Sequence, residues 1–166
     1  MKQPFVYEDI AAIRIPAQIA EELRSLAAEA RQRLGGELVT VSLWRSDYQD
    51  LVRVFSNQPE IYRPGGISRE LGADWVRKCV VEQVSFLAEN EDTINSDAFE
   101  NHDVLSALGL GAAINAVITD AGEFLGCLNL LDRAGAYSPA DVAVADTYAR
   151  KFAPVVQQLQ TLLPAE

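Results

Sequence analysis

Two asparagines and a cysteine stand among aliphatic residues in the segment "GLGAAINAVITDAGEFLGCLNLLD", which runs from 109 to 132. If this segment forms a hairpin with its turn at 119–123, the alternation of side chains places Asn115, Cys127 and Asn129 on one face. A buried amide needs hydrogen-bond partners, which the protein or a ligand can supply. These side chains are therefore candidates for the floor of a ligand pocket. The alternative, in which both asparagines bind neighbouring loops, stays open.

The same alternation predicts two faces of different composition for the hairpin. The polar face is predicted to carry Ala113, Asn115, Val117, Leu125, Cys127, Asn129 and Leu131. The apolar face is predicted to carry Ile114, Ala116, Ile118, Phe124, Gly126, Leu128 and Leu130. The apolar face suits packing against helices, with Gly126 permitting a close approach.

The glycines that open this segment do not form a dinucleotide-binding fingerprint. That fingerprint requires a strand, three glycines and then the N-terminus of a helix, whose free N–H groups bind the pyrophosphate. Here Gly109 and Gly111 follow a helical pattern, Ile114 stands at the third glycine position, and a strand pattern follows. Gly109 is instead expected to end a helix in a left-handed conformation.

Composition limits the class of protein. The 166 residues are 49% hydrophobic, which suffices for one core, so we expect a single domain over 1–166. The net charge of −10 argues against nucleic-acid and membrane-surface partners. The N-terminal sequence "MKQPFVYEDI" lacks a signal-peptide pattern and no apolar run could span a bilayer, so a cytoplasmic location is expected.

The titratable residues do not assemble a known catalytic or metal-binding motif. Cys79 and Cys127 have no CxxC spacing, and their apolar neighbours would raise the pKa of a thiol, so both are expected to be reduced and structural. The acidic segment 89–103 lacks the order of an EF-hand loop. Neither a Gly-x-Ser-x-Gly nor an HExxH motif is present, and we expect no enzyme activity.

Periodicity places these residues on elements. Apolar residues recur every three or four positions over 19–34, which predicts an amphipathic helix ended by Gly35 and Gly36. Alternation predicts strands at 37–44 and 50–56, with Val39, Val41 and Leu43 on one face and Thr40, Ser42 and Trp44 on the other. The remaining predicted elements are a loop at 57–72, a helix at 73–84, a strand at 85–89, a helix at 96–109 and hairpin arms at 112–118 and 123–131.

A long helix is predicted to follow the hairpin. Ser138 is suited to the N-cap, Pro139 to the first helical position and Asp141 to the first turn. Pro154 removes an intrahelical hydrogen bond, so a kink or a break is expected near Ala153.

The order of these elements, with "ALGLGAAINAVI", "TDAGE", "FLGCLNLL" and "YSPADVAVADTYA", resembles the GAF domain family. The resemblance covers residues 17–163 approximately. It implies an α+β fold of the GAF/PAS-like kind, in which an antiparallel sheet carries the terminal helices on one face. On the other face, loops and short helices would cover a small-molecule pocket. The family implies ligand binding or protein interaction more often than catalysis.

Three branches of this family provide specific tests. The cyclic-nucleotide signature is matched at Asn129, Tyr137 and Asp141, but Leu130 and Val142 replace its lysine and glutamate, so cyclic-nucleotide binding is not expected. The bilin-binding branch has a cysteine directly before a histidine, whereas this chain has Asn101-His102, so a covalent bilin is not expected. Methionine sulfoxide reduction by clustered cysteines remains the enzymatic alternative.

The resemblance also places a cover of rings over the polar face of the hairpin. We expect the ligand, whose identity and cofactor class the sequence leaves open, to contact the following residues: Trp44, Tyr62, Trp75, Phe86, Phe99, His102, Asn115, Cys127 and Asn129. The single histidine, His102, could contact the ligand or lie exposed on a helix. Arg63, Arg69 and Arg77 could pair with an anionic ligand group or face solvent.

The second hypothesis is a GAF-like homodimerisation module with a vestigial pocket. Its interface would use the helix at 19–34 and the last helix, whose apolar stripe contains Val142, Ala145, Tyr148, Ala149, Phe152 and Val156. The same residues are needed to cover the sheet, so only part of each stripe could serve a partner.

Overall fold

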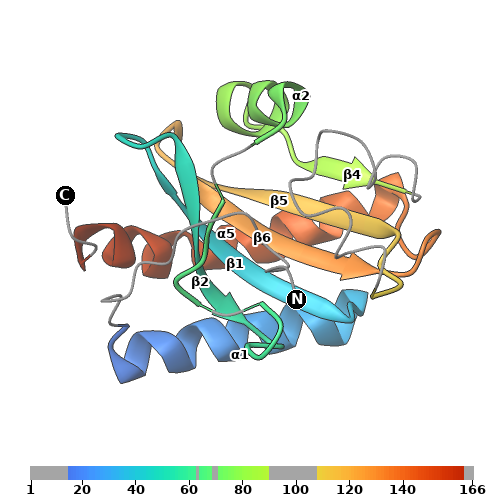
Figure 1. Cartoon of the computed structure of the whole chain (residues 1–166), viewed down its shortest axis with the longest axis horizontal. Coiled ribbons are helices and arrows are strands. Elements are labelled where there is room, and N and C mark those ends of the chain that lie inside the picture. Colours follow the sequence, from blue (N-terminus) through green and yellow to red (C-terminus); the bar gives the residue numbers. More distant parts are fainter. Residues whose placement is uncertain (1–14, 63, 69–70, 90–107, 163–166) are drawn as a thin grey trace, which may run out of the picture.

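A six-stranded antiparallel sheet forms the centre of the protein (Figure 1). The computed structural model describes residues 15–62, 64–68, 71–89 and 108–162. The strands are β1 (Leu38–Arg45), β2 (Asp50–Ser56), β3 (Ile67–Ser68), β4 (Phe86–Ala88), β5 (Ala112–Asp120) and β6 (Glu123–Asp132). Their order across the sheet is β3-β2-β1-β6-β5-β4. The predicted α+β class is confirmed, whereas β3 was not predicted because it is only two residues long and lies in the segment assigned as loop.

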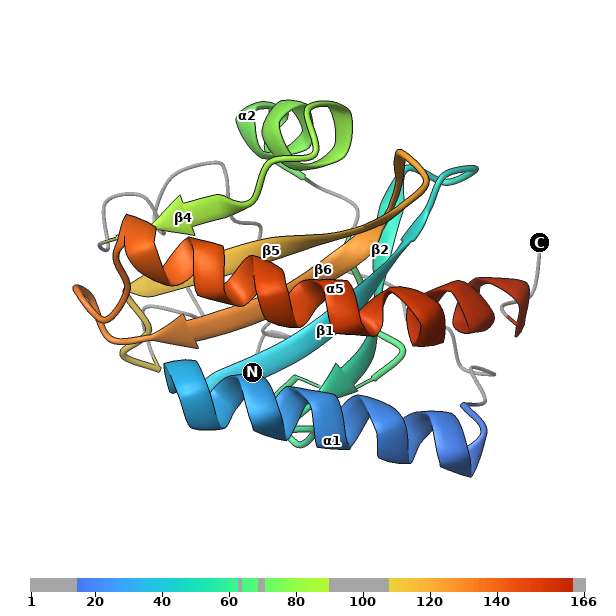
Figure 2. The ribbon, with the colours of Figure 1, turned by 180° about the vertical axis from the view of Figure 1, so that it is seen from behind.

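Two long helices cover one face of the sheet. The helices are α1 (Ala17–Leu34) and α5 (Pro139–Leu162), and Figure 2 shows them side by side in front of the strands. The main hydrophobic core lies between these helices and the sheet, and it includes Leu23, Val41, Ile114, Leu128 and Phe152, each fully buried. Burial of these apolar surfaces is the principal force that holds the two layers together.

The predicted alternation of β5 is confirmed, but β6 contains a bulge near the turn. Ile118 pairs with Gly126 and Thr119 pairs with Phe124, so Leu125 is an extra residue. As a result, Leu125 packs into the core under the helices, and Phe124 packs against Trp44 on the opposite face. Their predicted faces were therefore wrong, because a single inserted residue reverses the alternation beyond it.

The turn between β5 and β6 is tighter than the predicted 119–123. Ala121 and Gly122 connect the strands with φ angles of 52° and 80°. Positive φ at both central positions gives the turn a twist that matches paired strands.

Gly126 is required by the pairing of β6 with β1 rather than by helix packing. A Cβ atom at position 126 would lie 2.0 Å from the carbonyl oxygen of Ser42 on β1. A side chain there would push the two central strands apart. The close approach predicted for this glycine is therefore present, but its partner is the neighbouring strand.

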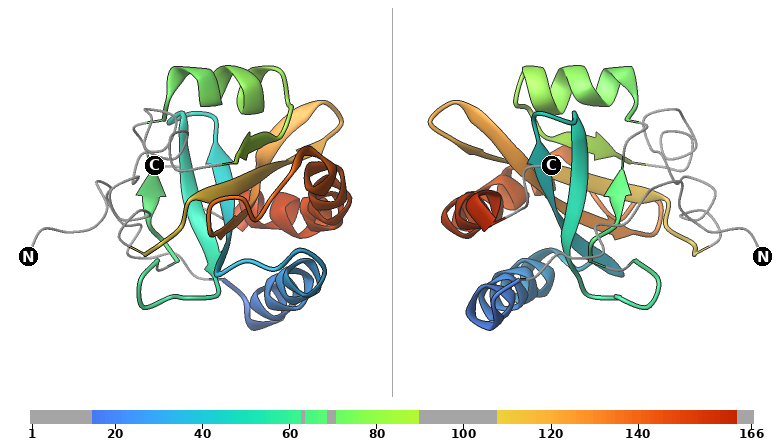
Figure 3. Two further views of the ribbon diagram at one scale, coloured as in Figure 1. Left: turned by 90° about the vertical axis from the view of Figure 1, so that its right-hand side faces the viewer. Right: turned by 60° about the vertical axis from the view of Figure 1, so that its left-hand side comes forward.

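A short helical segment lies at one end of the opposite face, as the views in Figure 3 show. It consists of α2 (Ala73–Trp75) and a π-helical turn, η1 (Val76–Val81). The predicted helix at 73–84 was therefore too long at its C-terminal end, where Gln83 adopts a φ of 57°. The Gln83 side-chain amide donates a 2.6 Å hydrogen bond to the Gly122 carbonyl, which links this end to the hairpin turn.

The start of α5 agrees with its predicted signals, but its interior does not. Asp141 Oδ2 accepts hydrogen bonds from the backbone N–H and hydroxyl of Ser138, at 2.9 and 3.3 Å. The helix continues through Pro154 to Leu162. Of the predicted kink or break near Ala153, the break is therefore wrong, since Phe152, Val155 and Val156 are all buried in the core and their packing outweighs one missing hydrogen bond, while the kink stays a prediction.

Among the described residues, no helix is both long and apolar enough to cross a membrane.

Candidate functional site: a polar row across the sheet

Strand register places a row of polar side chains across the face opposite α1 and α5. Asn115 on β5 pairs with Asn129 on β6, and Asn129 pairs with Thr40 on β1. Phe86 on β4 lies on the other side of Asn115. Residues directly opposite each other on antiparallel strands have neighbouring side chains on the same face. The row therefore follows from the same alternation that buries aliphatic residues under the helices.

The side chains of this row form a continuous chain of hydrogen bonds. The Trp75 indole N–H donates to Asn115 Oδ1 at 3.0 Å, and Asn115 Nδ2 donates to Asn129 Oδ1 at 2.8 Å. Asn129 Nδ2 then donates to the hydroxyl oxygens of Thr40 and Ser42, at 3.0 and 3.2 Å. Both asparagines thus have protein partners, but these lie on α2 and on neighbouring strands and not on the loops that the alternative named.

The chain of bonds has a fixed direction because an indole N–H can only donate. Trp75 therefore requires the oxygen of Asn115 to face it, and the Asn115 amide nitrogen then points towards Asn129. In the same way, Asn129 accepts with its oxygen and points its amide nitrogen towards β1. Thr40 and Ser42 accept at the end of the row and donate to no described residue. Their hydroxyl hydrogens are the donors that the row leaves for another molecule.

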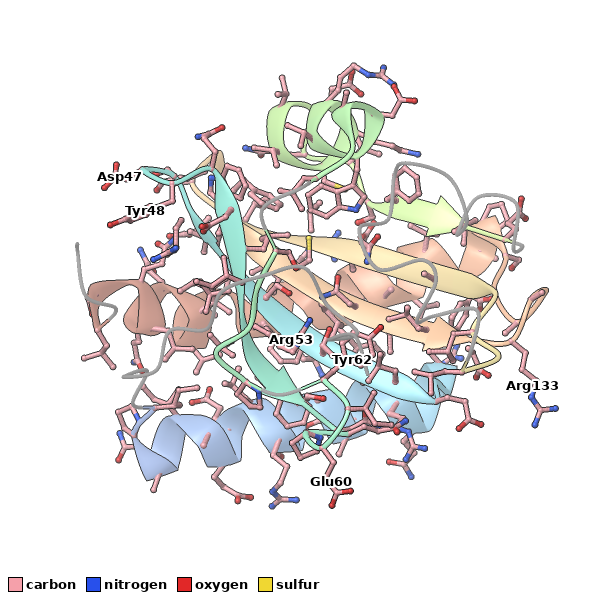
Figure 4. All side chains as sticks on the ribbon, viewed as in Figure 1. Asp47, Tyr48, Arg53, Glu60, Tyr62 and Arg133 are labelled. Atoms are coloured by element: carbon pink, nitrogen blue, oxygen red, sulfur yellow. The ribbon has the colours of Figure 1, made fainter. Side chains whose placement is uncertain are left out.

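A buried arginine lies beside this donor end. Arg53 on β2 is the register partner of Ser42 and is only 7% exposed. Its guanidinium carbon lies 4.9 Å from the ring centre of Tyr62, a cation–π distance. Figure 4 shows the Arg53 and Tyr62 side chains close together on this face of the sheet. Sequence reasoning missed Arg53, although an arginine inside the apolar strand "DLVRVFS" was a visible signal.

Apolar clusters border the polar row on both sides. One consists of Leu38, Tyr62, Ala88, Leu110, Ala113 and Leu131, with Phe86 packed against it. The other consists of Trp44, Leu51, Trp75, Cys79, Phe124 and Cys127. Trp44 and Phe124 meet edge to face with ring centres 5.6 Å apart. A small number of polar groups between apolar walls is typical of small-molecule sites.

The two thiols of this face are poor nucleophiles. Cys79 and Cys127 are fully buried, free and members of the same apolar cluster. Burial raises the pKa of Cys79 to about 12, against a smaller opposing effect of Lys78, and burial raises the pKa of Cys127 as well. A thiol reacts through its thiolate, so these pKa shifts disfavour thiol chemistry near neutral pH.

The structure brings most of the predicted site residues to this face. Trp44, Tyr62, Trp75, Asn115 and Cys127 are all buried there, with Asn129 and Phe86 beside them. Phe99, His102, Arg63 and Arg69 lie outside the described residues. Arg77 is 62% exposed and contacts Asp74 and Glu82 at 3.4 and 3.7 Å, so it lies on the surface of η1.

The residues that match the cyclic-nucleotide signature do not form one site. Asn129 lies in the polar row. Tyr137 belongs to the core cluster on the helix side of the sheet, and Asp141 binds Ser138 at the start of α5. Within the described part of the chain, no group of three or more His, Cys, Asp or Glu residues could hold a metal ion.

Comparison with known proteins gives one family. The profile described as "GAF domain" matches residues 18–156. A search of curated proteins found no match.

Solved structures with the same fold come from proteins of different kinds. A GAF domain/HD domain protein from Geobacter sulfurreducens has a TM-score of 0.69 and 12% identity, covering 86% of this chain and 94% of that one. A domain of a putative two-component sensor histidine kinase from Sinorhizobium meliloti 1021 has a TM-score of 0.59 and 15% identity, covering 88% and 96%. The type II free methionine-R-sulfoxide reductase from Thermoplasma acidophilum has a TM-score of 0.65 and 11% identity, covering 86% and 94%. At these identities the likeness concerns the fold alone.

Proposed function

This chain belongs to the GAF domain family, and from that premise we propose that it is a sensory or regulatory module that binds a small molecule over the polar row. The observation that carries the proposal is the direction of the row, which ends in the hydroxyl groups of Thr40 and Ser42 beside Arg53. Donors and a cation at one end of an otherwise apolar face suit a ligand with an acceptor-rich or anionic group and an apolar body.

Binding would use the two parts of the face differently. The anionic group of the ligand would accept from the hydroxyl groups and from the Arg53 guanidinium, whereas its apolar part would contact the clusters around Trp44 and Tyr62. The proposal includes no catalytic step, because the raised pKa values of Cys79 and Cys127 oppose nucleophilic chemistry.

Native mass spectrometry and thermal-shift screening test this function. The purified protein is expected to retain a small molecule, or to gain thermal stability from carboxylates or phosphates in a panel of metabolites. Thr40→Val with Ser42→Ala should weaken binding at least about tenfold, since each hydrogen bond to a charged group contributes about 1.5–3 kcal/mol. The matched control is Ser46→Ala, in the exposed turn after β1. Unchanged affinity in the double variant would place the ligand elsewhere.

The second candidate is homodimerisation through α1 and α5. It is favoured by the closed hydrogen bonding of Asn115 and Asn129, which lets the row exist without a ligand. Leu26, Val142 and Tyr148 are only partly buried against the core and could contact a second copy. Sedimentation at about 100 µM, where weak pairs are populated by mass action, should give a dimer. A monomer at that concentration would remove this candidate.

A further inference from the structure

A groove lies on the helix side of the sheet, away from the polar row. It has a volume of about 760 Å³ and runs between α1, the connection from α1 to β1, and the end of β2. Ala28 and Phe55 contribute apolar surface to it, and Arg31, Asn57 and Asp132 contribute polar groups. This volume is within the range of small-molecule sites, which is about 300–1,000 Å³.

Four charged residues line this groove, Arg24, Arg31, Glu37 and Asp132, and two of them, Arg31 and Asp132, do not pair with each other. Arg31 Nε donates a 2.8 Å hydrogen bond to the Gly36 carbonyl, which fixes the guanidinium group, while its two terminal nitrogens bind no described residue. Asp132 Oδ1 accepts from the Arg133 N–H at 2.8 Å, and its Oδ2 has no hydrogen-bond partner among the described residues. Both Arg31 and Asp132 are close enough to the Tyr137 hydroxyl to influence its pKa.

That hydroxyl group, which lies behind the groove residue Gly36 and outside the lining itself, is a third group that the protein leaves unsatisfied. Tyr137 is 3% exposed, and its hydroxyl finds no hydrogen-bond partner within the described part of the chain. It lies 3.2 Å from the position that a Cβ atom of residue 36 would take, so Gly36 leaves space beside it. A buried hydroxyl without a partner is costly, and such groups often mark the place of a ligand or a bound water.

We propose that this groove is a second binding site, which takes a zwitterionic amino acid with an apolar side chain. The carboxylate of the amino acid pairs with the terminal nitrogens of Arg31, and its ammonium group pairs with Asp132. Its side chain packs on Ala28 and Phe55. The ammonium and carboxylate groups of an amino acid are attached to the same carbon atom. One amino acid can therefore pair with both Asp132 and Arg31, which line the same groove and do not pair with each other. This site is independent of the proposed function of the opposite face.

The test is a titration of the full-length protein with L-leucine and L-phenylalanine, followed by amide chemical shifts. Shifts are expected at Gly35, Gly36 and Asn57, with a dissociation constant of about 1 mM because the site is open to solvent. N-acetyl-leucine lacks the ammonium charge and leucinamide lacks the carboxylate. Each is expected to bind at least about tenfold more weakly than leucine.

Matched variants examine the two charged partners. Arg31→Gln and Asp132→Asn should each weaken leucine binding about tenfold. Arg33→Gln removes the same charge from an exposed position on α1 outside the groove, and it should leave binding unchanged. Tyr137→Phe removes only the hydroxyl, so a folded variant with weaker binding supports a role for that group.

Three outcomes would overturn the second site. The first is an absence of shifts up to about 20 mM amino acid. The second is a set of shifts at Ser42, Asn115 and Asn129, which would assign the amino acid to the polar row. The third is equal binding of leucine, N-acetyl-leucine and leucinamide, which would show that the charge pair is not used. Failure of ligand binding at the polar row leaves all three measurements unaffected.

Discussion

The two faces of the same sheet are stabilised in different ways. Under α1 and α5, aliphatic side chains of β1, β5 and β6 pack against helices, and the described core there contains no polar row. On the opposite face, apolar clusters are separated by side chains that hydrogen bond to one another from Trp75 to Thr40. One face therefore depends on shape and area, and the other depends on hydrogen-bond direction. This difference teaches how each face could exchange a protein contact for a ligand contact: on the polar face the unused donors, Thr40 and Ser42, end a continuous row of hydrogen bonds.

The largest expected effect is on the helix face. Phe152→Ala removes a fully buried ring between α5 and the sheet, so the free energy of unfolding should fall by about 3–5 kcal/mol in urea denaturation. Gln157→Ala, on the exposed side of the same helix, should change it by no more than about 0.5 kcal/mol. A loss below about 1 kcal/mol for Phe152→Ala would contradict the importance of packing on this face.

Breaking the polar row should have an intermediate effect. Asn129→Leu leaves Asn115, Thr40 and Ser42 without their shared partner, so it should cost about 1–3 kcal/mol of stability in addition to weakening any ligand. A double-mutant cycle with Asn115→Leu should give a coupling of about 0.5–3 kcal/mol, since the two amides bind each other. Additive costs would mean that the row does not act as a unit.

High pH should lower the free energy of unfolding through different groups on the two faces, the thiols on the polar face and Tyr137 on the helix face. Cys79 and Cys127 stay protonated in the folded chain because burial raises their pKa values, whereas in the unfolded chain each ionises near pH 9. Stability from Cys79 is fully present below about pH 8.5 and is lost as the pH rises from about 9 to 12, by up to about 1.4 kcal/mol per pH unit, and Cys127 contributes a loss in the same direction.

Tyr137, on the helix face, also has a raised pKa, caused first by burial and then by Asp132 and Asp141. Its contribution to this loss begins about one pH unit higher than that of the thiols. Urea unfolding at pH 8, 9 and 10 measures the loss, and Cys79→Ala with Cys127→Ala should flatten the decline between pH 9 and 10. An equal slope in the parent and the variant would assign the decline to other groups.

The smallest expected effect is at the rim of the helix face. Lys151 on α5 and Glu29 on α1 form an ion pair at 3.4 Å, and both side chains are about half exposed. Solvent and salt screen such pairs, so Lys151→Met should change the free energy of unfolding by less than about 1 kcal/mol. A larger loss that disappears in 1 M salt would indicate that the two helices depend on charge as well as on packing.

Much of this architecture could be predicted from alternation and periodicity. The stripes of α1 and α5 and the opposite faces of β1 and β5 follow directly from the spacing of apolar residues. Predictions failed where a local feature competed with a longer pattern. The bulge at Leu125 placed Phe124 and Leu125 on the faces opposite to those predicted. Core packing stabilises α5 as a continuous helix through Pro154.

The candidate site was predictable only in part. Asn115 and Asn129 were identified because polar residues are conspicuous in an apolar hairpin, but their bonds to each other depend on strand register across three strands. Arg53 escaped notice because β2 pairs with β1 through a bulge between Val41 and Ser42, which decides where each side chain of the strand lies. Partners across a sheet are set by tertiary pairing, which one sequence does not contain.

The direction of the polar row has a consequence for detecting what binds to it. Each donor in the row points towards β1, so the small dipoles of the indole, the two amides and the hydroxyl groups add rather than cancel. A negative charge placed near Thr40 would polarise every bond in turn, and successive hydrogen bonds strengthen one another. The indole proton of Trp75 would then shift downfield in a proton spectrum and exchange more slowly with solvent, although its ring lies at the far end of the row. If a charged ligand binds at the row as proposed, the Trp75 indole proton would therefore report its charge.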